Sequence, residues 1–179
     1  MEPVKIIEKY YGTHSTACQI LIEHSRKVAD KALSIAQAHS EMNLDCSFIE
    51  EAAMLHDIGI IFCHAPRIGC YGAFDYICHG YLGAELLQKE GLARHALVCE
   101  RHTGTGITLK MIEKENLPLP HRDFLPISLE EQLICFADKF FSKQKQDEEK
   151  DIDKIQKSLQ KHGEETILRF NHLCKLFLG

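Results

Sequence analysis

A chain of 179 residues, 45% of them hydrophobic, is long enough for one domain with a substantial core and too short for several modules. Its formal net charge of −5 argues against a general binder of nucleic acids or membrane surfaces, because both partners are anionic and favour basic proteins. No stretch is long and apolar enough to span a membrane, and the charged N-terminal segment lacks the apolar centre of a signal peptide.

Apolar residues recur at helical spacing along most of the chain, and strand-like alternation is almost absent, which predicts an all-α fold. The first long amphipathic helix is predicted for residues 15–38, with His24 on its apolar stripe. A second helix is expected to open with a capping box made by Ser47 and Glu50, and to stop at Gly59. Its last turn carries a histidine and an aspartate, at positions 56 and 57.

Residues 62–75 contain one proline and two glycines, so we predict a loop that can cover a site. Helices are expected over residues 76–89 and 93–103, each ended by a glycine. After a proline-rich loop, a second capping box at residues 128–131 should start the helix that bears Asp138.

The polar run at residues 143–154 is predicted to be a solvated helix end or hinge with no binding role. Two short amphipathic helices, at residues 152–159 and 166–177, should then close a helical bundle. Their apolar side chains are expected to dock on the rest of the molecule: Ile155, Leu159, Ile167, Phe170 and Leu176. We therefore predict a single domain, with a core at residues 1–143 and C-terminal helices at residues 144–179 packed on it.

The eight cysteines are scattered, and no CxxC pair occurs. Several stand within apolar helical patterns, as Cys135 does, where a reduced thiol packs as a small hydrophobic group. Reduced thiols are typical of the cytoplasm, so we expect a cytoplasmic protein that is not exported.

Six side chains on different predicted helices, or at helix ends, are candidate metal ligands: His24, His56, Asp57, His79, His102 and Asp138. A helical bundle can collect ligands from facing helices, and imidazole and carboxylate ligands suit Mn, Fe, Zn, Ni or Mg. Neighbours on a regular helix diverge by about 100 degrees, so His56 and Asp57 can face one ion only if the helix unwinds near its end. Asp57, with two carboxylate oxygens, is assigned the role of bridging two ions.

The order of His24, the sequence His-Asp-Ile-Gly at residues 56–59, and Asp138 resembles the HD superfamily, and the four-residue sequence matches the motif of its HDIG subgroup. Further matches extend the resemblance to an uncharacterised HDIG family of predicted phosphohydrolases over about residues 20–143: residues 100–107, Leu117-Pro118, and residues 129–131 before 137–139. This resemblance implies an HD-type helical bundle that binds one or two divalent ions. Fe or Mn is expected first, with Mg, Zn and Ni as alternatives.

The same resemblance implies roles for the six ligands. His24, His56, Asp57 and Asp138 would hold the first ion, while His79 and His102 would hold a second ion bridged by Asp57. His56 and Asp57 would be the catalytic pair of a phosphohydrolase, in which a metal-activated hydroxide cleaves a phosphoester of a nucleotide or small phosphorylated metabolite. The expected partner is that small substrate, with no stable nucleic-acid complex and no membrane.

Position 60 is isoleucine, whereas many HDIG proteins have a basic residue there that meets a phosphate. Other cations must then bind the substrate, and the candidates are Lys139, Arg26, Lys27, His64 and Arg67. The chain also lacks the signatures of cyclic-di-GMP phosphodiesterases and of the diadenosine tetraphosphate hydrolases of this superfamily. Both of those activities are therefore discounted.

Two alternatives to hydrolysis stay open. Some HD proteins use the same four histidines and two aspartates as a mixed-valent di-iron oxygenase, and a non-catalytic metal or nucleotide sensor would need the same ligands. His95, one heptad before His102, is a competing ligand for that face. The remaining histidines are expected on the surface or in loops: His14, His39, His121, His162 and His172.

Overall fold

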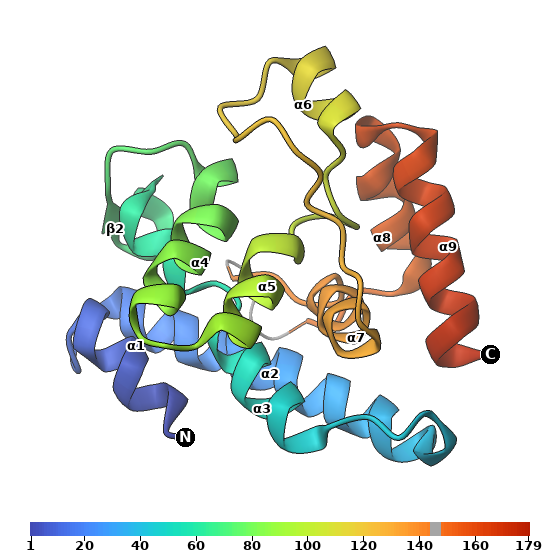
Figure 1. Cartoon of the computed structure of the whole chain (residues 1–179), viewed down its shortest axis with the longest axis horizontal. Helices are drawn as coiled ribbons and strands as arrows, with labels where there is room; N and C mark the ends of the chain where they lie inside the picture. Colours follow the sequence, from blue (N-terminus) through green and yellow to red (C-terminus); the bar gives the residue numbers. More distant parts are fainter. Residues whose placement is uncertain (144–147) are drawn as a thin grey trace.

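The computed structural model describes residues 1–143 and 148–179, and within these ranges the protein is built almost entirely of helices (Figure 1). The α-helices are α1 Pro3–Tyr11, α2 Thr16–Ala38, α3 Cys46–Leu55, α4 His79–Lys89, α5 Ala93–Arg101, α6 Leu109–Glu115, α7 Leu129–Asp138, α8 Ile152–Leu159 and α9 Glu164–Leu178. This confirms the predicted all-α class. No helix in the described ranges has the length and apolarity needed to cross a membrane.

The predicted loop at residues 62–75 contains a small antiparallel hairpin that periodicity did not reveal. Its strands are β1 His64–Ala65 and β2 Cys70–Tyr71, with His64 opposite Tyr71 and Ala65 opposite Cys70. Two-residue strands are too short to show alternation, so this prediction was incomplete. Short 3₁₀ turns flank the hairpin, and two of them matter for the site: η2 Ile58–Phe62 and η4 Tyr76–Cys78.

Helix starts agree with the predicted caps in one case and differ in the other. Ser128 caps α7, since its hydroxyl accepts a hydrogen bond from the backbone N–H of Glu131 at 3.1 Å. The box proposed for Ser47 and Glu50 is wrong, because α3 begins one residue before Ser47. Asp45 caps it instead, with Oδ1 accepting from the Phe48 N–H at 3.0 Å. Aspartate is among the most favoured N-cap residues.

Two short helices, α1 and α6, were not predicted. Helix α1 spans nine residues and buries Ile7 and Tyr11 against the helices that carry the site. Helix α6 spans seven residues and is capped by Thr108. Helices this short are marginal in isolation, so tertiary contacts rather than local propensity hold them.

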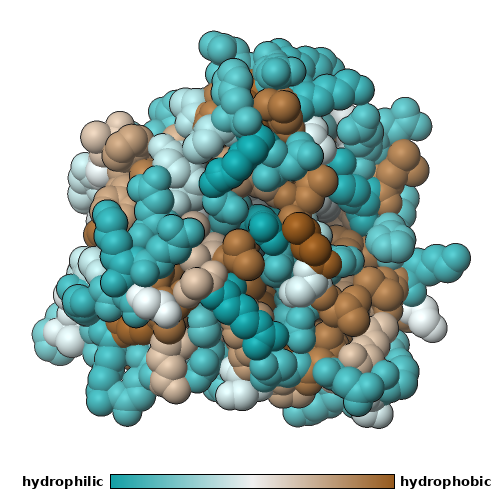
Figure 2. All heavy atoms as spheres, in the orientation of Figure 1, coloured by the Kyte–Doolittle hydropathy of each residue, from teal (hydrophilic) through white to brown (hydrophobic). Residues whose placement is uncertain are grey.

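The core joins the helices around the centre of the molecule. The C-terminal helices α8 and α9 lie beside each other on one side of α7 in Figure 1. The Phe136 ring of α7 stands 5.7 Å, centroid to centroid, from both Phe170 and Phe177 of α9. Ile155 and Leu159 are also buried, which confirms the expected docking of these helices. Hydrophilic side chains cover most of the face shown in Figure 2, with hydrophobic side chains in smaller separate areas.

Candidate metal centre

The turn after α3 brings two neighbouring side chains to one place. Helix α3 ends at Leu55, and the backbone at Asp57 (φ −107°, ψ 7°) departs from helical values before η2 begins. His56 Nε2 consequently lies 2.9 Å from Asp57 Oδ2. The predicted local unwinding at the helix end is confirmed.

Gly59 has a different role from the helix stop predicted for it. It lies inside η2, and a Cβ there would stand 2.0 Å from the His79 carbonyl oxygen and 2.4 Å from the Gly83 nitrogen. Only glycine permits this close approach of the turn to α4. The turn is also held by buried Tyr11, whose hydroxyl donates to the Ile58 carbonyl at 2.9 Å and accepts from the Ile61 N–H at 2.8 Å.

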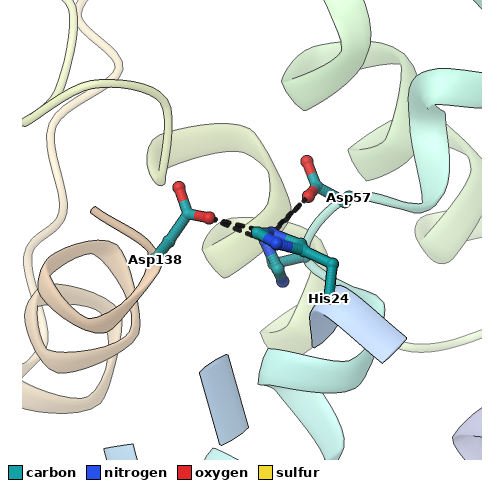
Figure 3. Close-up of side chains that lie close together, drawn as sticks. His24, Asp57 and Asp138 are labelled. Atoms are coloured by element: carbon teal, nitrogen blue, oxygen red, sulfur yellow. Dashed lines mark hydrogen bonds and ion pairs between the residues drawn. The ribbon is translucent and has the colours of Figure 1, made fainter. Parts of the chain in front are cut away.

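A first group of ligand atoms gathers around His24. His24 Nε2 lies 3.0 Å from Asp138 Oδ1 and 3.3 Å from Asp57 Oδ2, and Figure 3 shows its ring pointing between these two carboxylates. His56 Nε2 lies 3.5 Å from Asp138 Oδ1. One ligand atom from each of these four residues falls within 4.8 Å of every other. The group joins α2, the turn after α3, and the end of α7.

A second group gathers on the other oxygen of Asp57. His79 Nε2 and His102 Nε2 each lie 3.3 Å from Asp57 Oδ1, and they are 3.1 Å from each other. Oδ2 faces the first group while Oδ1 faces the second. Asp57 therefore belongs to both ligand groups, and the bridging role assigned to it from the sequence stays a prediction.

Backbone carbonyls fix the orientation of three of the histidines. Nδ1 of His56 donates to the Ala53 carbonyl at 2.6 Å, Nδ1 of His79 to Tyr76 at 2.6 Å, and Nδ1 of His102 to Cys99 at 2.7 Å. A proton on Nδ1 leaves the lone pair on Nε2, which is the atom that faces the centre. A hydrogen bond from the other ring N–H to a carbonyl or carboxylate is the usual way in which a protein orients a metal-binding histidine.

The donor set fits divalent metal ions. Ligands about 2.1 Å from one ion stand about 3.0 to 3.4 Å apart in octahedral or tetrahedral geometry. The separations here run from 2.9 to 3.5 Å. Among the described residues, His56 Nε2 and both oxygens of Asp57 are buried without an aligned hydrogen-bond partner. Buried polar atoms are rarely left so, and cations would satisfy them.

Charge interactions keep the two carboxylates of the site ionised. Burial raises the pKa of Asp57, but the charges of His56 and Lys143 outweigh it and hold that pKa well below its usual value. Burial likewise opposes ionisation of Asp138, and Lys139 and His24 reverse it, so its pKa is also well below normal. Both carboxylates are therefore ionised. The pKa of His79 falls to about 3 through burial and the neighbouring His102, which keeps its imidazole neutral. Burial lowers the pKa of His56, but Asp57 and Asp138 outweigh it and raise that pKa to about 9, so this imidazole must release a proton when an ion binds.

A cavity of about 600 Å³ lies beside the first group, with Asp138 in its lining. Its other charged side chains are basic, among the described residues: His64, Arg67, Lys139, Lys143, Lys150, Lys161 and His162. Three of the predicted substrate-binding residues, Lys139, His64 and Arg67, are thus at the cavity. His162 lies there too, on the exposed surface as predicted.

Arg26 is outside the cavity lining, contrary to the position expected for a substrate contact. Its guanidinium pairs with Glu50 at 2.9 Å on the exposed surface. Two residues along a helix are about 200° apart, so Arg26 faces away from the side of α2 that carries His24. Lys27 also lies outside the lining and pairs with Glu23 at 3.3 Å. His95, the competing ligand, stands 3.4 Å from Glu51 and outside both ligand groups.

Two lysines of the site were missed in the sequence. Lys143 Nζ lies 2.5 Å from Asp57 Oδ2, and Lys150 lines the cavity. Both belong to the polar run predicted to be solvated with no binding role. The solvated part of that prediction is wrong for these two, because the Lys143 side chain is 14% exposed and Lys150 is half-buried; residues 144–147 of the run lie outside the described residues. The only signal was spacing, since Lys143 follows Lys139 by four residues, as neighbours on a helical face do.

Comparisons with known proteins bear on this site. The HD domain family matches residues 21–142, which hold all six candidate ligands. An uncharacterised protein of Methanocaldococcus jannaschii is 36% identical over 146 residues, or 79% of either chain. Two tRNA (cytidine(56)-2′-O)-methyltransferases, from Thermoplasma volcanium and Picrophilus torridus, are each 32% identical over 127 residues.

That match covers 70% of this chain but only 33% of each methyltransferase, so the chain spans about a third of their length. No solved structure gives a significant match. The family match takes in more than half of the chain and contains the paired histidine and aspartate at the centre of the site. The protein belongs to the HD domain family.

Proposed function

We propose that this protein is a metal-dependent phosphohydrolase that cleaves a phosphoester of a nucleotide or other small phosphorylated metabolite. The observation that carries the proposal is a buried His/Asp cluster beside a basic cavity. The cluster suits divalent cations, and the cavity suits an anionic substrate. The family supports metal-dependent chemistry in general, and the cavity supports phosphate in particular.

Each ligand has a proposed role. His24, His56, Asp57 and Asp138 would hold one ion, and Asp57, His79 and His102 a second, with Fe or Mn the expected metals. When bound, such ions lower the pKa of water and stabilise charge on the attacking and leaving oxygens of a phosphoryl group. Asp57 belongs to both ligand groups, and His56 belongs to the first group and lies against Asp57. Activity should therefore depend most on these two residues.

Lysines near the ligands would hold the phosphate. Lys139 Nζ lies 2.9 Å from Asp138 Oδ2, and Lys143 lies against Asp57, so both ammonium groups stand where the cavity meets the cluster. Positive charge fixed at this point stabilises the added negative charge of a phosphoryl transition state. Tyr76 also lines the cavity, and its phenolic hydroxyl, protonated at neutral pH as in an ordinary tyrosine with a pKa of about 10, can donate a hydrogen bond to a phosphate.

The substrate is proposed to be a small molecule rather than an RNA. Two relatives are named as tRNA methyltransferases, but this chain matches only 33% of the length of each, so their tRNA substrate is not carried over. The net charge of the chain is −5, and the basic side chains beside the metal cluster line a cavity. We also propose a cytoplasmic location, because all eight cysteines are free and reduced thiols are typical of that compartment.

The test is a phosphoester panel given to purified protein loaded with Mn or Fe(II). The panel should contain nucleoside mono-, di- and triphosphates, cyclic nucleotides and sugar phosphates, with phosphate or nucleoside release as the readout. His56→Ala and Asp57→Ala, checked for folding by circular dichroism, set the background. If no compound is hydrolysed faster by the native protein than by these variants, the proposal is rejected.

A di-iron oxygenase is the second candidate, because the position of Asp57 between two groups that together contain four histidines would also suit the ligand set of that reaction type. It predicts substrate-dependent oxygen uptake and a mixed-valent iron signal in electron paramagnetic resonance. Full activity of Mn-loaded protein under anaerobic conditions would exclude it. Tight nucleotide binding without any turnover, measured by calorimetry and product analysis, would instead indicate a sensor.

A further inference from the structure

The cavity contains more positive charge than one phosphate at the metal centre needs. Arg67, Lys139, Lys143, Lys150 and Lys161 are in its lining, and Asp138 is the only carboxylate found there within residues 1–143 and 148–179. Lys139 and Lys143 lie against carboxylates of the metal cluster. Lys150 and Lys161 are then available to a second anion, because like charges gathered in the wall of one cavity favour an anionic ligand.

Lys150 and Lys161 come from a part of the chain after the matched family region, which ends at residue 142. No carboxylate of the described residues pairs with either lysine. Lys150 is half-buried, and its ammonium donates to the Phe141 carbonyl at 3.3 Å. Burial lowers the pKa of Lys150; Asp138 opposes that effect, and the nearby Lys139 and Lys143 add to it.

The core fixes the backbone near both lysines, while the Lys161 side chain itself is exposed. The backbone N–H of Lys150 donates to the Phe140 carbonyl at 2.8 Å, which ties it to the end of α7. Lys161 lies in the 3₁₀ turn Gln160–His162 directly after α8, whose Ile155 and Leu159 are buried in the core and also reach the cavity. Because α8 is anchored by these side chains, the cavity wall it makes is a rigid element.

We propose that Lys150 and Lys161 form a second anion subsite, and that the natural substrate carries a second phosphate group in addition to the one that meets the metal cluster. A volume of about 600 Å³ has room for such a compound, since small-molecule sites span about 300 to 1,000 Å³. Two lysines recognise phosphate as point charges and do not require a fixed geometry. This inference rests on the proposed function, which places the first phosphate.

The first experiment is calorimetric titration of Mn-loaded protein, desalted to remove free metal, with orthophosphate and with pyrophosphate. The variant is Lys150→Gln/Lys161→Gln, which keeps side-chain length and removes both charges. Lys157→Gln is the matched control, because Lys157 lies on α8, is exposed and does not line the cavity. Metal content measured after each titration shows whether pyrophosphate has extracted the metal.

We expect the native protein and the Lys157→Gln control to bind pyrophosphate at least about tenfold more tightly than orthophosphate, since each charge-assisted contact adds a factor of this order. The double variant should lose that preference, while its affinity for orthophosphate stays within about twofold of native. Equal affinities in the native protein, or an unchanged preference in the double variant, would overturn the inference.

A kinetic experiment separates this inference from the proposed function. For a nucleoside monophosphate and the corresponding diphosphate, the double variant should raise KM for the diphosphate about tenfold and leave KM for the monophosphate unchanged. If neither compound nor any other ester is hydrolysed, the proposed function fails while the calorimetric result still decides the subsite. If both are hydrolysed and the variant changes both KM values equally, the hydrolase stands and the second subsite does not.

Discussion

Lys143 places its ammonium group 2.5 Å from Asp57 Oδ2, the oxygen that also faces His24 and His56. Position 60, where many HDIG proteins have a basic residue, is isoleucine and is buried here. Lys143 therefore brings positive charge to the His-Asp turn from a different part of the chain. Its side chain is 14% exposed and lines the cavity, so it can meet both the carboxylate and a bound phosphate.

Replacing Lys143 should separate chemistry from metal binding. Lys143→Met is expected to lower kcat about 10²-fold, since one lost charge contact to a developing anion costs about that much. Metal affinity should be equal or tighter, because a cation next to Asp57 is removed. Steady-state kinetics and elemental analysis of the same preparation provide the check, with Lys157→Met as the control. Unchanged kcat, or loss of the metal, would contradict this role.

Metal stoichiometry should follow the two ligand groups. Elemental analysis of native protein is expected to give two ions per chain. His79→Ala and His102→Ala should retain the ion held by the first group and lose the second, whereas Asp57→Ala should lose both. His95→Ala is the control, because that side chain is partly buried but outside both groups, and it should keep both ions. Two ions remaining in Asp57→Ala would exclude a bridging carboxylate.

The N-terminal cap of α3 should make stability depend on pH. The Phe48 N–H and Arg94 lower the pKa of Asp45 in the folded protein, so its contribution is present above its unfolded pKa of about 3.9 and is lost as pH falls further. Asp45→Ala should reduce the free energy of unfolding by about 1 kcal/mol near neutral pH. The loss should shrink at about pH 3, where the native carboxylate is protonated.

Asp45→Asn is the matched control, since asparagine also caps helices but does not titrate. It should stay close to native stability near neutral pH and show a flatter pH dependence in the acid range. Urea unfolding at several pH values measures all three proteins. A constant difference between native and Asp45→Ala across that range would show that the carboxylate charge contributes nothing.

The contact between the turn and α4 should not tolerate a methyl group. Gly59→Ala places a Cβ 2.0 Å from a backbone oxygen, so the two segments must separate, and we expect a loss of about 3 kcal/mol in the free energy of unfolding. Gly91→Ala is the control: its φ of +77° costs about 1 kcal/mol, with nothing within 4 Å to clash. Equal losses in the two variants, measured by urea unfolding, would show that close packing at Gly59 is unimportant.

The gathering of the candidate ligands could be predicted from the sequence because these residues lie on strong local patterns. The apolar stripe of α2 placed His24 toward the core, and the cap at Ser128 located the helix of Asp138. The unwinding at His56 and Asp57 could be predicted because adjacent side chains on a regular helix diverge, so they can converge only where the helix ends. Such features depend on a few neighbouring residues, so they can be recognised without knowing the fold.

The features that could not be predicted from the sequence depend on how distant segments pack in the folded chain. Lys143 sits in a polar run without periodicity and beyond the end of α7 at Asp138, so no helical register predicts its contact with Asp57. Arg26 was one of the cations considered for the substrate in place of a basic residue at position 60, yet helical rotation directs it to the exposed surface, where it pairs with Glu50. Helices α1 and α6 are short, and their positions come from contacts with distant segments.

His24 and Asp138 are 114 residues apart along the chain, and their side chains meet at 3.0 Å. An ion held between them and the turn after α3 would act as a cross-link among three separate segments, and a second ion would add α4 and α5. Withdrawing the metal would release all of these long-range ties together and leave like-charged carboxylates facing each other. The lifetime of the folded protein against proteolysis would then follow the supply of metal, independently of whether substrate is present.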